Sequence, residues 1–124
     1  MPFFKRSFEN PILVPQNDLP WEAEGAFNGS AIREKGKTRL FYRAQSLPLL
    51  HDDGPWLSLS SIGQADSTDG IHFKNHRPAI EPELHWERYG CEDPRITRVD
   101  GKYYIFYTAL SEFPFRAEGI SVGL

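Results

Sequence analysis

The stretch that decides the fold is PRITRVDGKYYIFYTA, residues 94–109. Two runs rich in β-branched and aromatic residues flank the pair Asp100–Gly101. Asp-Gly between such runs is a strong signal for a β-hairpin, because glycine readily adopts a positive φ. An earlier stretch, SAIREKGKTRLFYRA at residues 30–44, has the same form of strand, glycine turn and strand. The sequence therefore predicts two similar antiparallel hairpins.

The two hairpins belong to an internal repeat. The motif Phe-Tyr-x-Ala at residues 41–44 recurs at residues 106–109, an offset of 65 residues. In the first copy we predict a third strand at residues 59–67 and, after a Thr-Asp-Gly turn, an outer strand at residues 71–75. Residues 118–124 match the third strand in the second copy. A repeat of several short antiparallel strands is typical of β-propeller blades.

We therefore expect an all-β chain that forms one partial β-propeller domain over residues 1–124, with blade-like repeats at about residues 27–73 and 90–124. Two blades cannot close a propeller, and repeat units bury their faces against neighbours. This predicts that the chain is part of a longer protein. The alternative is a small two-sheet β domain that is complete at Leu124.

The composition bounds the partners. The net charge of −3 gives no basic surface for binding nucleic acid. The sequence has no apolar run of about 18 residues, so no membrane-spanning helix is expected. The N-terminus lacks the pattern of a signal peptide, so a cytoplasmic location is expected. The four histidines have no convincing metal-ligand spacing. We expect no metal and no cofactor.

The segment before the second hairpin carries the strongest candidate for chemistry. Asp93 directly precedes Pro94, which favours an extended backbone at Asp93 and fixes φ at the start of the strand. A carboxylate held in this way could act as a catalytic acid, or it could only accept hydrogen bonds in a turn. Glu92 and Arg95 flank it as possible supporting residues, and Arg95 is interpreted as structural. Strand alternation predicts that Glu92 and Asp93 point to opposite faces.

Two residues of the first repeat are candidates for substrate binding. Asn28 lies at the position equivalent to Asp93, and Arg43 lies in the strand that follows. Arginine offers a rigid fork of donors and asparagine offers both donors and acceptors, which suits sugar hydroxyls. The alternative for Arg43 is a surface ion pair, which contributes little stability.

Other residues have ordinary interpretations. Asp69 is interpreted as a turn residue and Cys91 as a packed thiol. The three tryptophans could stack on sugar rings, but packing is the usual role of this side chain. They are Trp21, Trp56 and Trp86.

A series of motifs, taken in order, resembles glycoside hydrolase family 130, the mannoside phosphorylases and related β-mannosidases. The motifs are ENPILVP, WEAEGAFNGSAI, GKTRLFYRA, SSIGQADSTDGIHF, YGCEDPRIT and GKYYIFYTAL, and they cover residues 9–124. Family members are five-bladed β-propellers, so the resemblance implies that this chain covers roughly the first two blades. It departs from many phosphorylases in having FNGS, not FNPA, at residues 27–30.

The resemblance implies a mechanism for the intact protein. Asp93 is expected to be the general acid, with its proton passing through a sugar hydroxyl to the glycosidic oxygen. Inorganic phosphate then attacks the anomeric carbon with inversion. Asn28 and Arg43 are expected to hold the mannosyl unit of a mannose-containing oligosaccharide. In the family, the phosphate-binding residues lie in later blades, so this sequence does not decide between phosphorolysis and hydrolysis. The resemblance also makes a homo-oligomer an expectation.

Two alternatives remain at this stage. One is a glycosidase of another five-bladed class, such as the arabinan- or fructan-cleaving enzymes. The other is a non-catalytic fragment, because the chain as given lacks further blades. We expect the isolated chain to be inactive and to associate through open sheet edges.

Overall fold

The computed structural model describes residues 3–52 and 54–124, which form nine β-strands and two short 3₁₀ helices. The strands are β1 (Gly25–Glu34), β2 (Lys37–Gln45), β3 (Leu49–Leu50), β4 (Trp56–Leu57), β5 (Ser60–Ser67), β6 (Lys74–Ile80), β7 (Gly90–Val99), β8 (Lys102–Leu110) and β9 (Ile120–Gly123), and the helices are η1 (His85–Glu87) and η2 (Ala117–Gly119). The prediction of an all-β chain is confirmed. Neither helix in the described residues is long and apolar enough to cross a membrane.

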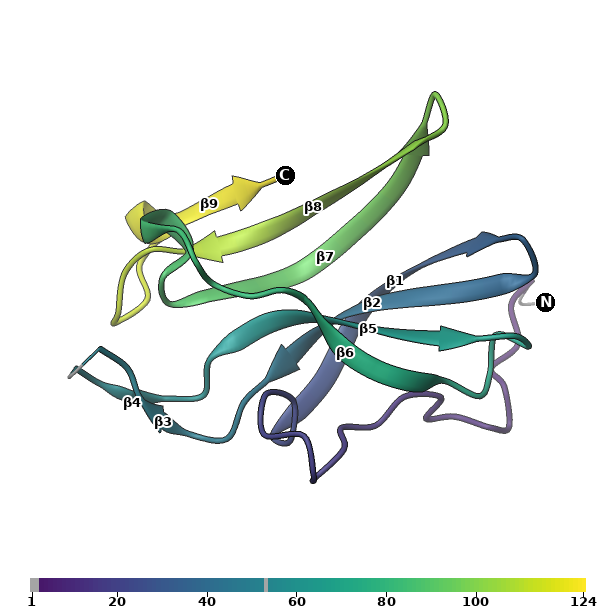
Figure 1. The fold of residues 1–124 in the computed structure, drawn as a ribbon, viewed down its shortest axis with the longest axis horizontal. Coiled ribbons are helices and arrows are strands. Elements are labelled where there is room, and N and C mark those ends of the chain that lie inside the picture. Colours follow the sequence, from purple (N-terminus) through teal and green to yellow (C-terminus); the bar gives the residue numbers. More distant parts are fainter. Residues whose placement is uncertain (1–2, 53) are drawn as a thin grey trace.

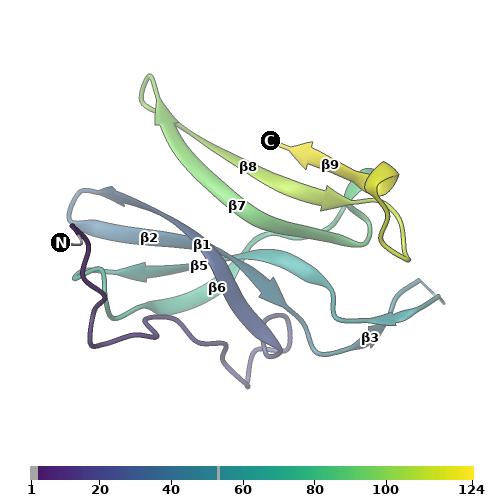
Figure 2. The same ribbon diagram turned by 180° about the vertical axis from the view of Figure 1, so that it is seen from behind.

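Two antiparallel sheets make up the fold. The first has the strand order β1-β2-β5-β6, the second has the order β7-β8-β9, and β3 pairs with β4 in a separate small ribbon. The two sheets meet along β7, which contacts β1, β2 and β5. They spread apart toward the ends of the β1–β2 and β7–β8 hairpins (Figure 1), and Figure 2 shows the same divergence from behind.

Both predicted hairpins have the same two-residue turn. Lys35 and Gly36 have φ values of 49° and 77°, and Asp100 and Gly101 have φ values of 49° and 77°. Two positive φ values in a row are the signature of a type I′ turn, whose twist matches that of the flanking strands. The glycine at the second position makes this turn accessible in each hairpin.

The outer strand of the first sheet lies later in the sequence than predicted. We predicted it at residues 71–75, but β6 covers Lys74–Ile80. The carboxylate of Asp69 accepts hydrogen bonds from the backbone N–H groups of Ile71 and His72, so this segment is a turn and not a strand. Pro78 is tolerated within β6 because β6 is the edge strand, where a missing N–H breaks no sheet bond on the open side.

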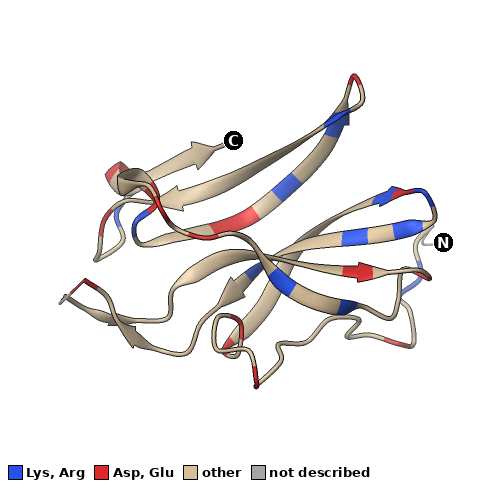
Figure 3. Ribbon diagram, viewed as in Figure 1, with Lys and Arg blue, Asp and Glu red and all other residues tan. Residues whose placement is uncertain are grey.

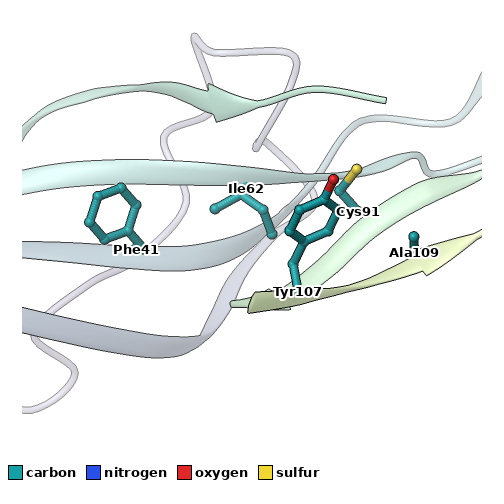
Figure 4. Packing of buried hydrophobic residues seen from close by; sticks show 5 residues of the cluster. All are labelled: Phe41, Ile62, Cys91, Tyr107 and Ala109. Atoms are coloured by element: carbon teal, nitrogen blue, oxygen red, sulfur yellow. The ribbon is translucent and has the colours of Figure 1, made fainter. Parts of the chain in front are cut away.

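In the described residues, one buried cluster (Tyr42, Ala44 and Ala65) belongs to the first sheet alone, and a second cluster lies between the two sheets. Figure 4 shows side chains of the first sheet packed against side chains of the second. The members of this second cluster are Phe41, Ile62, Cys91, Tyr107 and Ala109. Since both sheets contribute to a single cluster, the docking of one sheet on the other is fixed by apolar packing.

A buried carboxylate just before each repeat accepts a hydrogen bond from a tyrosine within that repeat. In the first repeat the Tyr42 hydroxyl donates to Glu22 Oε2 at 2.6 Å, and His76 Nδ1 lies 2.8 Å from Glu22 Oε1. The Trp21 ring stacks on the Tyr42 ring with centroids 6.4 Å apart. Glu22 and Tyr42 are both fully buried, and burial raises the pKa of Tyr42, with Glu22 adding to the shift.

The second repeat copies this arrangement 65 residues later. The Tyr107 hydroxyl donates to Glu87 Oε2 at 2.8 Å, and the Trp86 ring stacks on Tyr107 at 6.2 Å. Burial alone would raise the pKa of Glu87, but hydrogen bonds from the backbone of Glu83 and Leu84, and from Tyr107, together hold it below its ordinary value. A Trp-Glu pair shortly before β1 or β7 and a tyrosine in the following strand, β2 or β8, therefore form a repeated structural element.

Candidate active site

Asn28 lies in an irregular part of β1. The pairing of β1 with β2 shifts register between Phe27 and Ser30, and Asn28 has a φ of 53°. An extra residue in one strand forms a β-bulge, which redirects the side chain that it carries. Asparagine is one of the few residues other than glycine that adopts this left-handed conformation readily.

Asp93 has the same local structure in β7. The pairing of β7 with β8 shifts register between Glu92 and Arg95, and the φ of Asp93 is also 53°. The prediction of an extended backbone at Asp93 is therefore wrong. The bulge places this residue in the left-handed region, where aspartate is tolerated because its short side chain can bond locally.

The two bulges bring the two sheets together through a hydrogen bond. Asn28 Nδ2 donates to Asp93 Oδ1 at 2.8 Å, although the residues are 65 apart in the sequence. The sequence predicted that these residues occupy equivalent positions of the repeat. The structure adds that they contact each other across the boundary between the sheets.

Arg43 is held beside this contact by three partners. Its Nε donates to Ser60 Oγ at 3.0 Å, and its guanidinium carbon lies 5.1 Å from the centre of the Phe27 ring. Its Nη2 lies 2.6 Å from Glu92 Oε2. The distance makes this an ion pair, but the N–H does not point at that oxygen, so Oε2 has no aligned hydrogen bond.

The Arg43–Glu92 pair differs from an ordinary surface ion pair. The side chains are 21% and 14% exposed, so solvent screens the charges only partly. Burial raises the pKa of the Glu92 carboxyl, Arg43 opposes this shift, and Asp93 reinforces it. The prediction that Glu92 and Asp93 point to opposite faces is wrong, because the bulge interrupts strand alternation and both side chains contact the first repeat.

Arg95 lies outside this group. Its Nη1 donates to the backbone carbonyl of the neighbouring Pro94 at 2.7 Å. The next residue, Ile96, donates its backbone N–H to Ser30 Oγ at 3.1 Å, which adds a second link between the sheets. These contacts hold the middle of β7 in place.

Sequence reasoning missed the partners of Arg43. Ser60 begins β5 opposite Gln45, and nothing in the sequence indicated its bond to an arginine of the neighbouring strand. Phe27 precedes Asn28 and could have been noticed as an aromatic neighbour. The rings of Trp21 and Trp86 stack on tyrosine rings, whereas Trp56 is 70% exposed.

The tips of the β1–β2 and β7–β8 hairpins differ from the candidate site in their charged residues. Lys and Arg gather there, whereas an acidic band marks the first half of β7 (Figure 3). A cavity of about 460 Å³ opens between the two hairpins. It is lined by Ile32, Glu34, Lys35, Lys37, Arg39, Phe41, Ile96, Tyr103 and Ile105. None of the candidate site residues lines this cavity.

The described residues contain no cluster of three or more His, Cys, Asp or Glu side chains arranged to hold a metal ion. Cys91 is fully buried, and burial raises the pKa of its thiol, which disfavours the reactive thiolate. The chemistry of the candidate site therefore rests on the carboxylates of Glu92 and Asp93, the amide of Asn28 and the guanidinium of Arg43.

Comparison with known proteins identifies the family. The profile of glycoside hydrolase family 130, described as β-1,4-mannooligosaccharide phosphorylase, matches residues 4–121. The chain belongs to glycoside hydrolase family 130. This confirms the family resemblance predicted from the motifs and removes the arabinan- or fructan-cleaving class as the family of this chain.

Characterised relatives are mannoside phosphorylases. The chain is 43% identical over 108 residues to the β-1,2-mannobiose phosphorylase of Thermoanaerobacter sp. (strain X514), covering 83% of this chain and 36% of that protein. It is 37% identical over 109 residues to the 1,2-β-oligomannan phosphorylase of the same organism, covering 87% and 36%. The chain thus spans about a third of the length of these relatives.

A solved structure supports the same assignment. The β-1,2-mannobiose phosphorylase of Listeria innocua, in complex with β-1,2-mannobiose, superposes with a TM-score of 0.72 at 26% identity. The match covers 87% of this chain and 44% of that protein. The family 130 chain described here therefore shares its fold with a mannoside-binding relative.

Proposed function

We propose that the protein to which this chain belongs cleaves β-mannosides with inversion, by phosphorolysis, and that Asp93 is its general acid. The observation that carries this proposal is the Asn28–Asp93 contact, which presents a carboxylate between the two sheets with the Arg43 guanidinium close by. A carboxylate fixed in this way can deliver a proton to a leaving oxygen. No resident cofactor is required.

The proposed reaction is balanced without an oxidant or a reductant. An oxygen of inorganic phosphate forms a bond to the anomeric carbon while the glycosidic C–O bond breaks. The bonding electrons go to the leaving oxygen, which receives the proton of Asp93, directly or through a sugar hydroxyl. The products are mannose 1-phosphate of inverted configuration and a shortened mannoside, with phosphate as co-substrate.

We propose a β-1,2 linkage as the substrate class. Two relatives at 43% and 37% identity are phosphorylases of β-1,2-mannobiose and 1,2-β-oligomannan, and the Listeria structure holds β-1,2-mannobiose. Arg43 supports sugar recognition, because Ser60, Phe27 and Glu92 hold its guanidinium, and the described residues form no further hydrogen bond with its other N–H groups, which could bind hydroxyls. Hydrolysis is the second candidate, since phosphate-binding groups lie outside this chain in the family pattern.

The same proposal extends to architecture. We propose that residues 1–124 supply the first two blades of a five-bladed propeller, each main sheet being the core of one blade. The inactivity of the isolated chain and a homo-oligomeric state stay predictions.

The proposed acid is tested with Asp93→Asn in the protein expressed from its complete gene. General acid catalysis typically contributes about 10²–10⁴-fold, so the variant should lose at least about 100-fold in kcat on β-1,2-mannobiose with inorganic phosphate. Mannose 1-phosphate is measured by phosphorus NMR. Asp100→Asn, which changes an exposed aspartate at a hairpin turn, is the matched control.

Two outcomes would contradict this proposal. Full activity of Asp93→Asn would remove Asp93 from the role of acid. Release of free mannose at the same rate with and without phosphate would replace phosphorolysis by hydrolysis.

A further inference from the structure

The contact between Asn28 and Asp93 constrains the carboxylate in a specific way. Asn28 Nδ2 donates to Oδ1 at 2.8 Å. Within residues 3–52 and 54–124, Oδ2 of Asp93 makes no hydrogen bond to a protein group. The two oxygens of the carboxylate are therefore not equivalent.

The difference between Oδ1 and Oδ2 determines which oxygen of Asp93 can carry a proton. An ionised carboxylate only accepts hydrogen bonds, so the amide of Asn28 must present its NH₂ group and not its carbonyl oxygen. A proton on Oδ1 would face this N–H group, donor against donor. A proton on Oδ2 leaves the hydrogen bond from Asn28 intact.

Resting on the proposed role of Asp93 as general acid, we propose that Asn28 is a positioning residue that directs the catalytic proton to Oδ2 of Asp93. Asn28 thereby fixes the direction of proton delivery. This role differs from direct binding of the mannosyl unit, which is the role that the family resemblance implies for this residue.

The backbone holds both partners in place. Asn28 and Asp93 occupy equivalent bulges with the same φ of 53°, and regular strand pairing flanks each bulge on both sides. The hydrogen bond from Ile96 N–H to Ser30 Oγ links the same two strands nearby. A side chain on such a constrained backbone has little freedom to turn away from its partner.

The charged side chains near Asp93 have other partners, so Asn28 is the residue that positions the carboxylate. Glu92 is paired with Arg43, whose Nε is in turn bonded to Ser60. None of these three side chains donates a hydrogen bond to Asp93 in the described structure. Asn28 is therefore the donor whose loss would free the Asp93 carboxylate to rotate.

The leaving group of the substrate separates positioning from sugar binding. A mannose leaving group needs a proton as the glycosidic bond breaks, whereas 2,4-dinitrophenolate is a stable anion and leaves without one. A residue that orients the acid affects only the first kind of substrate. A residue that binds the mannosyl unit affects both kinds, because both contain that unit.

The experiment uses Asn28→Gly in the protein expressed from its complete gene. Glycine removes the amide but readily adopts the positive φ of this position, so the bulge is retained. Asn75→Gly is the matched control, because Asn75 has a φ of 59° in the edge strand β6, outside the candidate site. Both variants are assayed with β-1,2-mannobiose and with 2,4-dinitrophenyl β-mannoside, each with inorganic phosphate.

We expect Asn28→Gly to lose about 10–100-fold in kcat on mannobiose, the scale of a misplaced reacting group, and less than about 3-fold on the dinitrophenyl substrate. An equal loss on both substrates would assign Asn28 to sugar binding and overturn the inference. Unchanged activity on both would also overturn it.

Asp93→Asn with the same two substrates separates this inference from the proposed function. If Asp93 is the acid, its loss is selective for mannobiose in the same way. If Asp93→Asn affects both substrates equally, the acid assignment itself fails. If only Asn28→Gly lacks this selectivity, the acid assignment stands and the positioning role of Asn28 fails.

Discussion

Tyr42→Phe tests the buried Glu22–Tyr42–His76 group. The hydroxyl of Tyr42 donates to Glu22 Oε2 at 2.6 Å, and both residues are fully buried. Phenylalanine fills the same volume but leaves Glu22 Oε2 without a donor and out of reach of water. A hydrogen bond to a buried charged group contributes about 1.5–3 kcal/mol, and loss of one partner exposes the full desolvation penalty of the other. We therefore expect Tyr42→Phe to lower the free energy of unfolding by about 2–3 kcal/mol.

Urea unfolding of the protein expressed from its complete gene measures this loss. With an m-value of about 2–3 kcal/mol/M, the midpoint should fall by about 1 M, and an unchanged m-value would show that the compactness of the end states is unchanged. Tyr103→Phe is the control, because Tyr103 is 38% exposed. Its effect should stay within about 0.5 kcal/mol. If the two variants had the same midpoint, the reasoning about the buried carboxylate would be refuted.

Two further predictions concern packing and charge. A Cβ on Gly63 would lie 2.6 Å from Cζ of Tyr42, so Gly63→Ala should destabilise the fold by about 1–3 kcal/mol through overpacking; a thermal midpoint equal to that of the wild type would contradict this. The Asp69 carboxylate raises the pKa of His72, so Asp69→Asn should lower that pKa toward about 6.5, as measured by NMR titration. Because the pKa of His72 is raised in the folded state, the ion pair between His72 and Asp69 stabilises the turn below about pH 6.5. This stabilisation is lost as the pH rises through the raised pKa. If Asp69→Asn left the pKa of His72 unchanged, the result would argue against this ion pair.

The hairpins were predictable because their turns are encoded locally. The pairs Lys35–Gly36 and Asp100–Gly101 place a glycine where a type I′ turn needs a positive φ. The strands on each side have the β-branched and aromatic residues that fit a half-buried sheet. Local preference and tertiary structure agree at these positions, so the sequence alone was sufficient.

The bulges at Asn28 and Asp93 could not be predicted in the same way. A bulge arises from a mismatch in length between two paired strands, and no single residue encodes that mismatch. The preference imposed by Pro94 favoured an extended backbone at Asp93, but strand pairing on both sides of the bulge outweighed it. The same bulge invalidated the alternation argument for Glu92.

The buried carboxylates had a signal that was available but unused. The Trp-Glu pair at residues 21–22 recurs at residues 86–87, with the same offset as the rest of the repeat. Two identical pairs at a repeat distance, each followed 20 residues later by a tyrosine, indicate a shared structural role. Glutamate is so seldom fully buried that composition alone gave no reason to place it in a core.

The hydrogen bond between Asn28 and Asp93 joins two sheets that are otherwise held together mainly by apolar packing. The position of the Asp93 carboxylate thus depends on the angle between the two sheets, and a change elsewhere in their interface would move it before it disturbed either sheet. The two partners stand at matching points of a repeated sequence with the same backbone twist. Their side chains differ only in that asparagine has an amide NH₂ group where aspartate has a carboxylate oxygen, and this one exchange lets one residue donate the hydrogen bond that the other accepts.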